Sequence, residues 1–120
     1  MSVREVQSKP TPMAHFPDGY RWLELHDQDD IYAFCAFRPR EEAMELHLSM
    51  MRWSRQTLAK VRQDIEWLKM ETRRLGLSAI MGIKVNTEGE FDPKLFRFSE
   101  LFGFSEHCVV QTTTLRLDDG

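Results

Sequence analysis

The chain has 120 residues, of which 42% are hydrophobic and 11% aromatic, and its formal net charge is −3. This length fits one domain with a modest core, and this apolar content is too high for a disordered protein. Charges of both signs are interspersed, so we expect no general attraction to nucleic acid or to an anionic membrane. No apolar run approaches a bilayer span, and the first residues lack a secretory signal, which predicts a cytoplasmic protein.

Residues 1–19 contain three prolines and little periodicity, which predicts an extended N-terminal arm without a core of its own. Four scattered apolar side chains allow this arm to pack against another surface: Val3, Val6, Met13 and Phe16. We expect them to bind a partner, either the chain's own domain or a neighbouring chain. Residues 20–120 are expected to form the domain itself.

Three strand-like segments follow the arm. Residues 20–26 and the nearly continuous apolar run 31–37 flank a polar turn, and a second turn at 38–42 leads to residues 44–50. In the last segment apolar residues alternate with polar ones, so one face is expected to be buried and the other to meet solvent or a partner. Together the segments predict an antiparallel meander.

A long amphipathic helix is predicted from Ser54 to Leu75. Ser54 is a good N-cap, and apolar residues recur every three or four positions along a single seam. Gly76 can adopt the left-handed conformation that ends a helix. Residues 77–85 then predict a strand that begins directly after the helix.

The last part of the chain predicts one more helix and one more strand. Asp92 and Pro93 provide a cap and a first-turn proline, and the dense apolar surface that follows is stopped at Gly103. The run from Cys108 to Leu117 is rich in threonine and β-branched residues, which favours a final strand.

From Tyr20 to Leu117 this order of elements, with Gly103-Phe104 before the final strand, resembles the Gcn5-related N-acetyltransferase (GNAT) family. The resemblance implies an α+β fold with three layers. We expect a truncated GNAT-like mixed sheet with an antiparallel N-terminal meander, one long helix and one short helix. Only about 19 residues precede the first strand, so we expect the two helices that form the family's acceptor-substrate wall to be absent here. One face of the sheet should then be less covered, and either a partner protein or the N-terminal arm could fill that space.

In this family the turn before the long helix carries Arg/Gln-x-x-Gly-x-Gly/Ala and binds the pyrophosphate of acetyl-CoA. Small residues let backbone amides approach the anion, and the helix dipole favours negative charge there. Here residues 51–57 contain no glycine, and Trp53 adds bulk. We therefore expect no cofactor. If acetyl-CoA binding is retained, the residues that could hold a phosphate are Arg52, Ser54 and Arg55.

Many active members also carry a tyrosine shortly before the Gly-Phe pair, where it protonates the departing thiolate. Ser99 stands at that position, and a serine hydroxyl is a much poorer acid than a phenol. We accordingly predict no catalytic residue. In an active enzyme, Glu45 or His47 would be the base that deprotonates the acceptor amine.

Two further sets of residues are candidate sites. Glu24 with His26 and Glu45 with His47 could form a metal or acid–base cluster on neighbouring strands, but alternation on an exposed face explains them, so no metal is predicted. Cys35 and Cys108 lie in apolar runs without metal-ligand spacing, and we expect buried thiols rather than a disulfide.

Within the broad family, this compact and glycine-poor chain resembles the acetyltransferase-like proteins encoded among virion genes of short-tailed bacteriophages. The resemblance implies a non-catalytic structural or interaction protein, a pseudoenzyme that is a component of a phage virion or of its assembly. Its partners would be proteins in a larger assembly, with symmetric copies among the options, and its place the host cytoplasm or the virion. The alternative is a divergent acetyl-CoA-dependent N-acetyltransferase.

Overall fold

The computed structural model describes residues 3–83, 93–109 and 113–117. The chain divides into two compact units, Met1–Val85 and Asn86–Gly120. Within the described ranges, no helix is both long enough and apolar enough to cross a bilayer.

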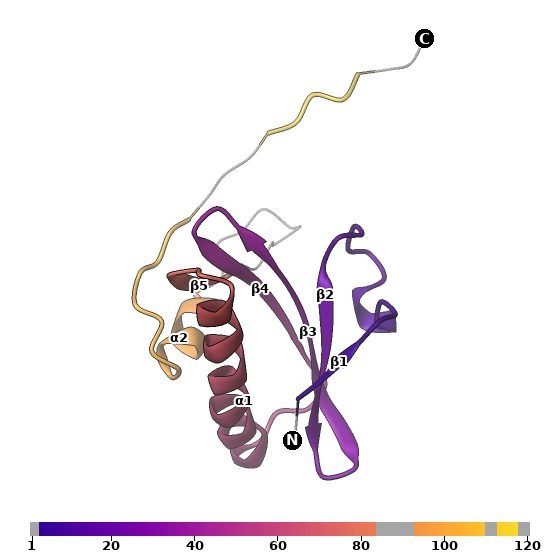
Figure 1. Ribbon diagram of the computed structural model, residues 1–120, viewed down its shortest axis with the longest axis vertical. Helices are drawn as coiled ribbons and strands as arrows, with labels where there is room; N and C mark the ends of the chain where they lie inside the picture. Colours follow the sequence, from indigo (N-terminus) through magenta and orange to yellow (C-terminus); the bar gives the residue numbers. More distant parts are fainter. Residues whose placement is uncertain (1–2, 84–92, 110–112, 118–120) are drawn as a thin grey trace. The chain divides into compact units, whose positions relative to one another are not determined.

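The first unit is built on a five-stranded mixed sheet in the order β1-β2-β3-β4-β5 (Figure 1). Four strands form an antiparallel meander: β1 (Val3–Val6), β2 (Arg21–Asp27), β3 (Asp30–Arg40) and β4 (Ala43–Met50). β5 (Ala79–Gly82) pairs with β4 in parallel after a helical crossover. The predicted α+β fold class is confirmed, and the meander gains a fourth strand from the N-terminal segment.

The turns between the meander strands are tighter than the sequence predicts. Gln28 and Glu41 adopt positive φ angles of 59° and 57°, which closes each hairpin with two residues. β3 therefore runs on to Arg40 through Pro39. The pairing of β2 with β3 ends at Arg21 and Phe37, so the amide hydrogen that proline lacks costs no hydrogen bond to β2.

The crossover is α1 (Arg55–Arg74), a 20-residue helix that covers one face of the sheet (Figure 1). Ser54 caps its first turn as predicted, and Gly76 ends it with a φ angle of 75°. The predicted apolar seam is the buried side, with Val61, Ile65 and Leu68 facing the sheet. Burying these side chains is the main source of the helix's stability, because in proteins most helical stability comes from packing an amphipathic face.

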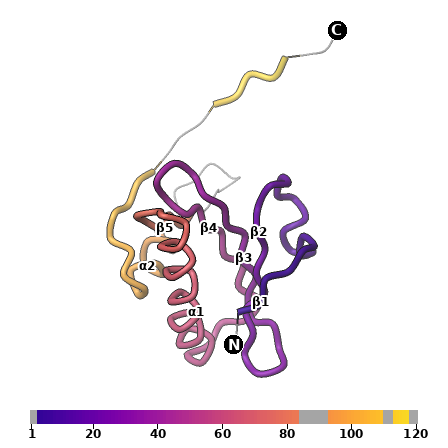
Figure 2. Tube along the Cα trace, in the orientation of Figure 1, coloured from indigo at the N-terminus to yellow at the C-terminus, as the bar shows by residue number. Residues whose placement is uncertain are grey.

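The segment after β1 folds back beside β2 and contains a short 3₁₀ helix, η1 (Thr11–Met13) (Figure 2). Met13 is 1% exposed and packs with Trp22 and Ala36. Leu25 and Cys35, by contrast, face α1. Because odd and even residues of a strand point to opposite faces, the N-terminal segment covers the face of the sheet away from α1.

The predicted strand over 77–85 is shorter in the structure. The Ser78 amide donates to the Glu42 carbonyl at 2.9 Å and the Ile83 amide to the Leu46 carbonyl at 3.0 Å, so pairing with β4 spans only β5 and its flanks. The last two residues of the predicted strand lie outside the described residues, as does the expected turn at 86–90.

The second unit contains α2 (Lys94–Glu100), which Gly103 ends with a φ angle of 92° as the sequence predicts. The predicted cap Asp92 lies outside the described residues. The predicted final strand is wrong for the residues that the structure describes: Cys108, Val109 and Thr113–Leu117 form no strand. Strand propensity is fulfilled only when a neighbouring strand accepts the backbone hydrogen bonds.

Candidate functional site

The turn between β4 and α1 is where the sequence resemblance places the phosphate-binding loop of acetyltransferases. Its first two amides point into the protein: Met51 N and Arg52 N both donate to the Tyr32 carbonyl oxygen, at 2.7 and 3.3 Å. A third and a fourth amide close a capping box, in which Thr57 N donates to Ser54 Oγ at 3.1 Å and Ser54 N donates to Thr57 Oγ1 at 2.8 Å. Four amides of residues 51–57 therefore have acceptors within the chain.

The three candidate phosphate ligands lie together at this turn, but two of them have other partners. Ser54 Oγ already accepts the Thr57 amide, and Arg52 Nη1 lies 3.6 Å from Asp30 Oδ2. Arg55 is exposed at the first helical position. Trp53, 62% exposed, adds bulk on the outside of the turn. The turn thus offers cationic side chains and a helix end, while four of its backbone amides are already bonded within the chain.

A second candidate site lies on the opposite face of the sheet, where Glu45 of β4 is 2% exposed. One of its carboxylate oxygens accepts the Tyr20 hydroxyl and lies 2.7 Å from His47 Nε2. The other lies 3.4 Å from Arg38 Nε and 3.6 Å from Arg40 Nη1. A buried carboxylate needs partners of this kind, and here two cations and two hydrogen-bonding groups supply them.

The electrostatics of this cluster keep Glu45 ionised. Burial opposes its charge, but the hydrogen bonds from Tyr20 and His47 outweigh that cost and hold the pKa of Glu45 below its usual value. Burial, followed by the hydrogen bond to Glu45, raises the pKa of Tyr20. The lowered pKa makes Glu45 a weaker base than an ordinary carboxylate, because general bases work best with a pKa near the ambient pH.

The N-terminal segment covers this site on the solvent side. Phe16 contacts the His47 ring edge-on at 5.0 Å and the Tyr20 ring at 5.5 Å. The Arg38 guanidinium stacks on Tyr20 at 4.2 Å. The expectation of an exposed face is therefore wrong for Glu45. Of the two options for filling this face, the structure has the N-terminal arm, because residues before β2 cover the position.

The other sequence candidates stay separate. His26 Nε2 lies 3.1 Å from Glu24 Oε1, but within the described ranges no group of three His, Cys, Asp or Glu side chains is placed to hold a metal ion. Cys35 is buried as expected, and burial raises the pKa of its thiol. Cys108 is exposed, so the expectation of a second buried thiol is wrong.

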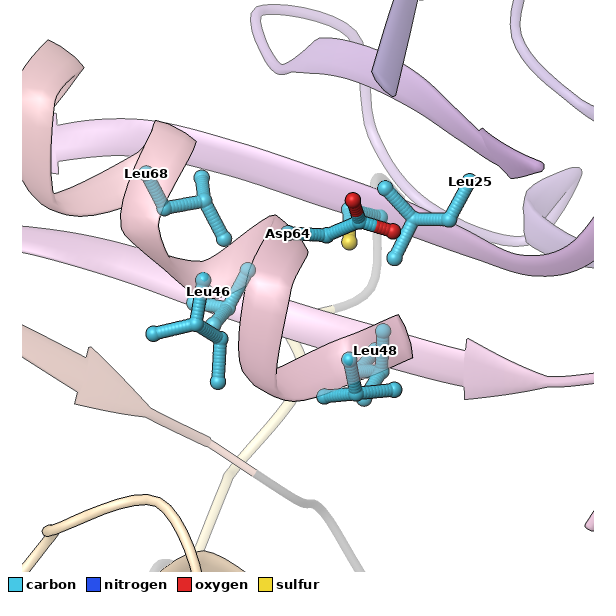
Figure 3. Close-up of a pocket in the computed structure, with 8 residues that line it drawn as sticks. Leu25, Leu46, Leu48, Asp64 and Leu68 are labelled. Carbon is cyan, nitrogen blue, oxygen red and sulfur yellow. The ribbon is translucent and has the colours of Figure 1, made fainter. Parts of the chain in front are cut away.

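Between α1 and the sheet lies a cavity of about 20 Å³, lined by Leu25, Leu46, Leu48 and Leu68 and by the Asp64 carboxylate (Figure 3). The Tyr32 hydroxyl donates to Asp64 Oδ2, and burial followed by this bond raises the pKa of the phenol. The cavity has room for one water molecule and none for a cofactor.

The four residues expected to bind a partner lie on or beside the sheet. Val3 and Val6 lie in the edge strand β1, and Val6 and Phe16 pack against the cluster around Trp22, in which Met13 is buried. Met13 and Phe16 thus contact the chain's own domain, the first of the two options the sequence leaves open.

Sequence reasoning missed three members of the Glu45 cluster: Tyr20, Arg38 and Arg40. A signal for Arg38 was present, because a two-residue turn at 41–42 sets Arg38 directly opposite Glu45 in the hairpin. No local pattern points to Tyr20, which the chain brings to Glu45 from 25 positions away.

No protein-family model and no curated protein matches the sequence. Two solved structures, each described in provisional terms as an acetyltransferase, resemble the fold. One, described as a "probable acetyltransferase", shares 14% identity and a TM-score of 0.54, over 84% of this chain and 70% of the other. The other, YycN from Bacillus subtilis, shares 16% identity and a TM-score of 0.54, over 88% and 68%. At these identities the likeness establishes a GNAT-like fold.

Proposed function

We propose that this protein is a non-catalytic GNAT-like structural or interaction module. The observation that carries the proposal is that four amides of residues 51–57 are bonded within the chain: two donate to the Tyr32 carbonyl oxygen, and two close the capping box between Ser54 and Thr57. A diphosphate is held by amides that point out of such a turn, and side-chain cations alone give a much looser site.

The closed face above Glu45 supports the same proposal. In an acetyltransferase the acceptor amine must reach a base within hydrogen-bonding distance. Here the carboxylate is 2% exposed and already bonded to Tyr20 and His47, and Phe16 packs against both rings. The cluster thus holds the N-terminal segment in place, and its charged groups are paired with one another.

We propose that the module belongs to a phage particle or to an intermediate in its assembly. It would then be found in the virion or in the host cytoplasm. The basis is the resemblance of this compact, glycine-poor chain to acetyltransferase-like virion proteins of short-tailed bacteriophages. The direct test is quantitative mass spectrometry of purified particles and of whatever assembly the protein co-purifies with. A fixed copy number relative to a known particle component supports this role, and absence from every assembly contradicts it.

The lack of a cofactor is tested separately by thermal denaturation with millimolar acetyl-CoA. A ligand at a hundred times its dissociation constant stabilises a protein by about 2.7 kcal/mol, which is a shift of several degrees for a domain of this size. We expect no shift. The matched control is the double variant Arg52→Ala with Arg55→Ala, which removes the cations and leaves the backbone of the turn intact.

One observation favours the alternative, a divergent acetyl-CoA-dependent N-acetyltransferase. β4 pairs with β5 over Ala43–Leu46, and its remaining residues to Met50 pair with β3 on the other side. Among the described residues no strand lies beside this end of β4 on the side away from β3, where its backbone groups are available to an extended ligand. If acetyl-CoA raises the melting temperature and the double variant abolishes the rise, this alternative holds, with Glu45 or His47 as the candidate base.

A further inference from the structure

The two edges of the sheet are protected to very different degrees. β1 carries Arg4 and Glu5 at its centre, and charges on an edge strand discourage pairing with another chain. β5 reads Ala79-Ile80-Met81-Gly82, with neither a charge nor a proline, and Met81 is 38% exposed. Natural sheets seldom leave so apolar an edge bare.

The direction of the backbone groups shows what this edge offers. The Ile83 amide donates to Leu46 of β4, and backbone groups of successive strand residues alternate in direction. The amides of Ile80 and Gly82 therefore point away from β4. Since the sheet ends at β5 within the described residues, these groups present a hydrogen-bonding edge to an added strand.

The second unit contains a segment whose sequence favours a strand but which has no strand to pair with among the described residues. Residues Thr113–Leu117 read Thr-Thr-Leu-Arg-Leu, a composition that favours strands, yet they form none. Leu115 and Leu117 are 86% and 84% exposed and would share one face of a strand. Two leucines on one face of an extended segment form an apolar stripe that a partner surface can cover.

We propose that residues 113–117 of one copy add as a strand to the β5 edge of a second copy. Both are without a strand partner among the described residues of a single chain, and a five-residue segment fits a four-residue edge. Backbone hydrogen bonds supply the affinity in such strand addition, and alternate side chains set the orientation. Reciprocal exchange closes a two-fold dimer. This inference rests on the proposed interaction role and identifies the partner.

The register of β5 predicts which side chains meet. Met81 pairs with Glu45 and Ile80 with Met44, so Ile80 lies on the face that α1 covers and Met81 on the other. Leu115 and Leu117 should lie beside Ile80 on the apolar face. Thr114 and Arg116 should then lie on the face of Met81.

Disulfide trapping between two different chains tests this arrangement. In a Cys108→Ser background, one chain carries Met81→Cys and the other carries Thr114→Cys or Arg116→Cys. We expect mild oxidation of the mixture to give a product of twice the chain's mass, because a disulfide forms only when the Cα atoms are about 4–7 Å apart. Leu115→Cys is the matched control. Its side chain should face away from Met81 and cross-link at least about tenfold more slowly than the better of the two test positions.

Two outcomes overturn the proposal. One is the absence of a cross-link from both Thr114→Cys and Arg116→Cys. The other is a disulfide within one chain when both cysteines are placed in the same molecule, which would mean that the segment pairs with its own sheet. Neither outcome depends on acetyl-CoA, so a failure here is distinguishable from a failure of the non-catalytic function.

Sedimentation equilibrium gives an independent readout. We expect the wild type to dimerise with increasing concentration and the double variant Leu115→Asp with Leu117→Asp to weaken the dimer about tenfold or more. Val109→Asp, at another exposed apolar position of the same unit, should leave it unchanged. A wild type that stays monomeric at all concentrations, or an equal effect of Val109→Asp, would contradict strand exchange.

Discussion

The two terminal segments of this chain each behave as the composition of the other predicts: the N-terminal segment forms a strand, and the described part of the C-terminal segment forms none. Residues 1–19 contain three prolines, yet they supply the edge strand β1 and bury Met13 in the sheet. Residues 108–117 are rich in threonine, yet the part that the structure describes forms no strand. The comparison teaches that a strand is made by the surface it joins, and that local propensity only permits it.

The N-terminal segment joins the sheet because its strand is held by contacts of both backbone and side chains. β1 pairs with β2, and Arg21 of β2 binds Glu5 of β1 through two hydrogen bonds of 2.8 Å and Glu71 of α1 at 2.6 Å. Arg74 binds the same Glu71 at 2.5 and 2.9 Å. The network links the edge strand to the helix around a side chain, Glu71, that is itself nearly buried.

Replacing Met13 with Ala should have the largest effect. Removing a fully buried methionine side chain leaves a cavity against Trp22 and Ala36 and costs about 3 kcal/mol of unfolding free energy. Urea denaturation measures the loss. Met13→Leu, which conserves volume, should cost less than about 1.5 kcal/mol. A Met13→Ala variant as stable as the wild type would mean that the segment is not part of the folded core.

Replacing Arg21 with Ala should rank second. The change removes the Arg21 contacts of Glu5 and Glu71, leaves Glu71 its contact with Arg74, and removes the stacking of the guanidinium on Phe37 at 4.6 Å. Hydrogen bonds to charged groups and this stacking together suggest a loss of about 2 kcal/mol. Arg4→Ala, a charge change on β1 itself, is the control and should alter stability by less than about 0.5 kcal/mol. Equal effects of the two variants would show that net charge, rather than the network, matters.

Acid should loosen the same network over a defined range. Hydrogen bonds from Arg74 and Arg21 outweigh burial and lower the pKa of Glu71 from its usual 4.5 to about 2. A lowered carboxyl pKa contributes stability above its unfolded value and loses it as the pH falls toward the folded value. We expect the unfolding free energy to drop by about 1–2 kcal/mol between pH 5 and pH 2 through this group, with Glu5 and Glu45 acting in the same direction. The drop should be smaller in Arg21→Ala, and an identical pH profile would contradict the assignment.

Most of the central fold could be predicted because its signals are local. The cap at Ser54, the seam through Val61, Ile65 and Leu68, and the stop at Gly76 all lie within one helix, and each is where the sequence places it. β1 could not be predicted in the same way. It is four residues long, carries two charges, and pairs with residues about twenty positions away.

The two candidate sites also differ in whether local sequence signals reveal them. The glycine-free start of α1 is readable from residues 51–57, although the Tyr32 carbonyl that binds two of its amides comes from β3. The burial of Glu45 could not be read, because alternation along β4 indicates only which face a side chain occupies. What covers that face is Phe16 and Tyr20, and their positions depend on the path of the N-terminal segment.

The smallest effect should come from Leu115→Ala, measured on protein diluted until sedimentation detects only the monomer. Leu115 is 86% exposed, so its truncation should change the unfolding free energy by less than about 0.5 kcal/mol. At concentrations where strand exchange occurs the same change should lower the melting temperature, because a partner that binds only the folded state adds stability by mass action. If Leu115→Ala lowers the unfolding free energy of the dilute monomer, Leu115 must be buried against its own chain. The C-terminal segment would then be part of the monomer's core, as Met13 is. A leucine that matters only at high concentration makes the C-terminal segment the counterpart of the N-terminal one, with a surface that another molecule provides.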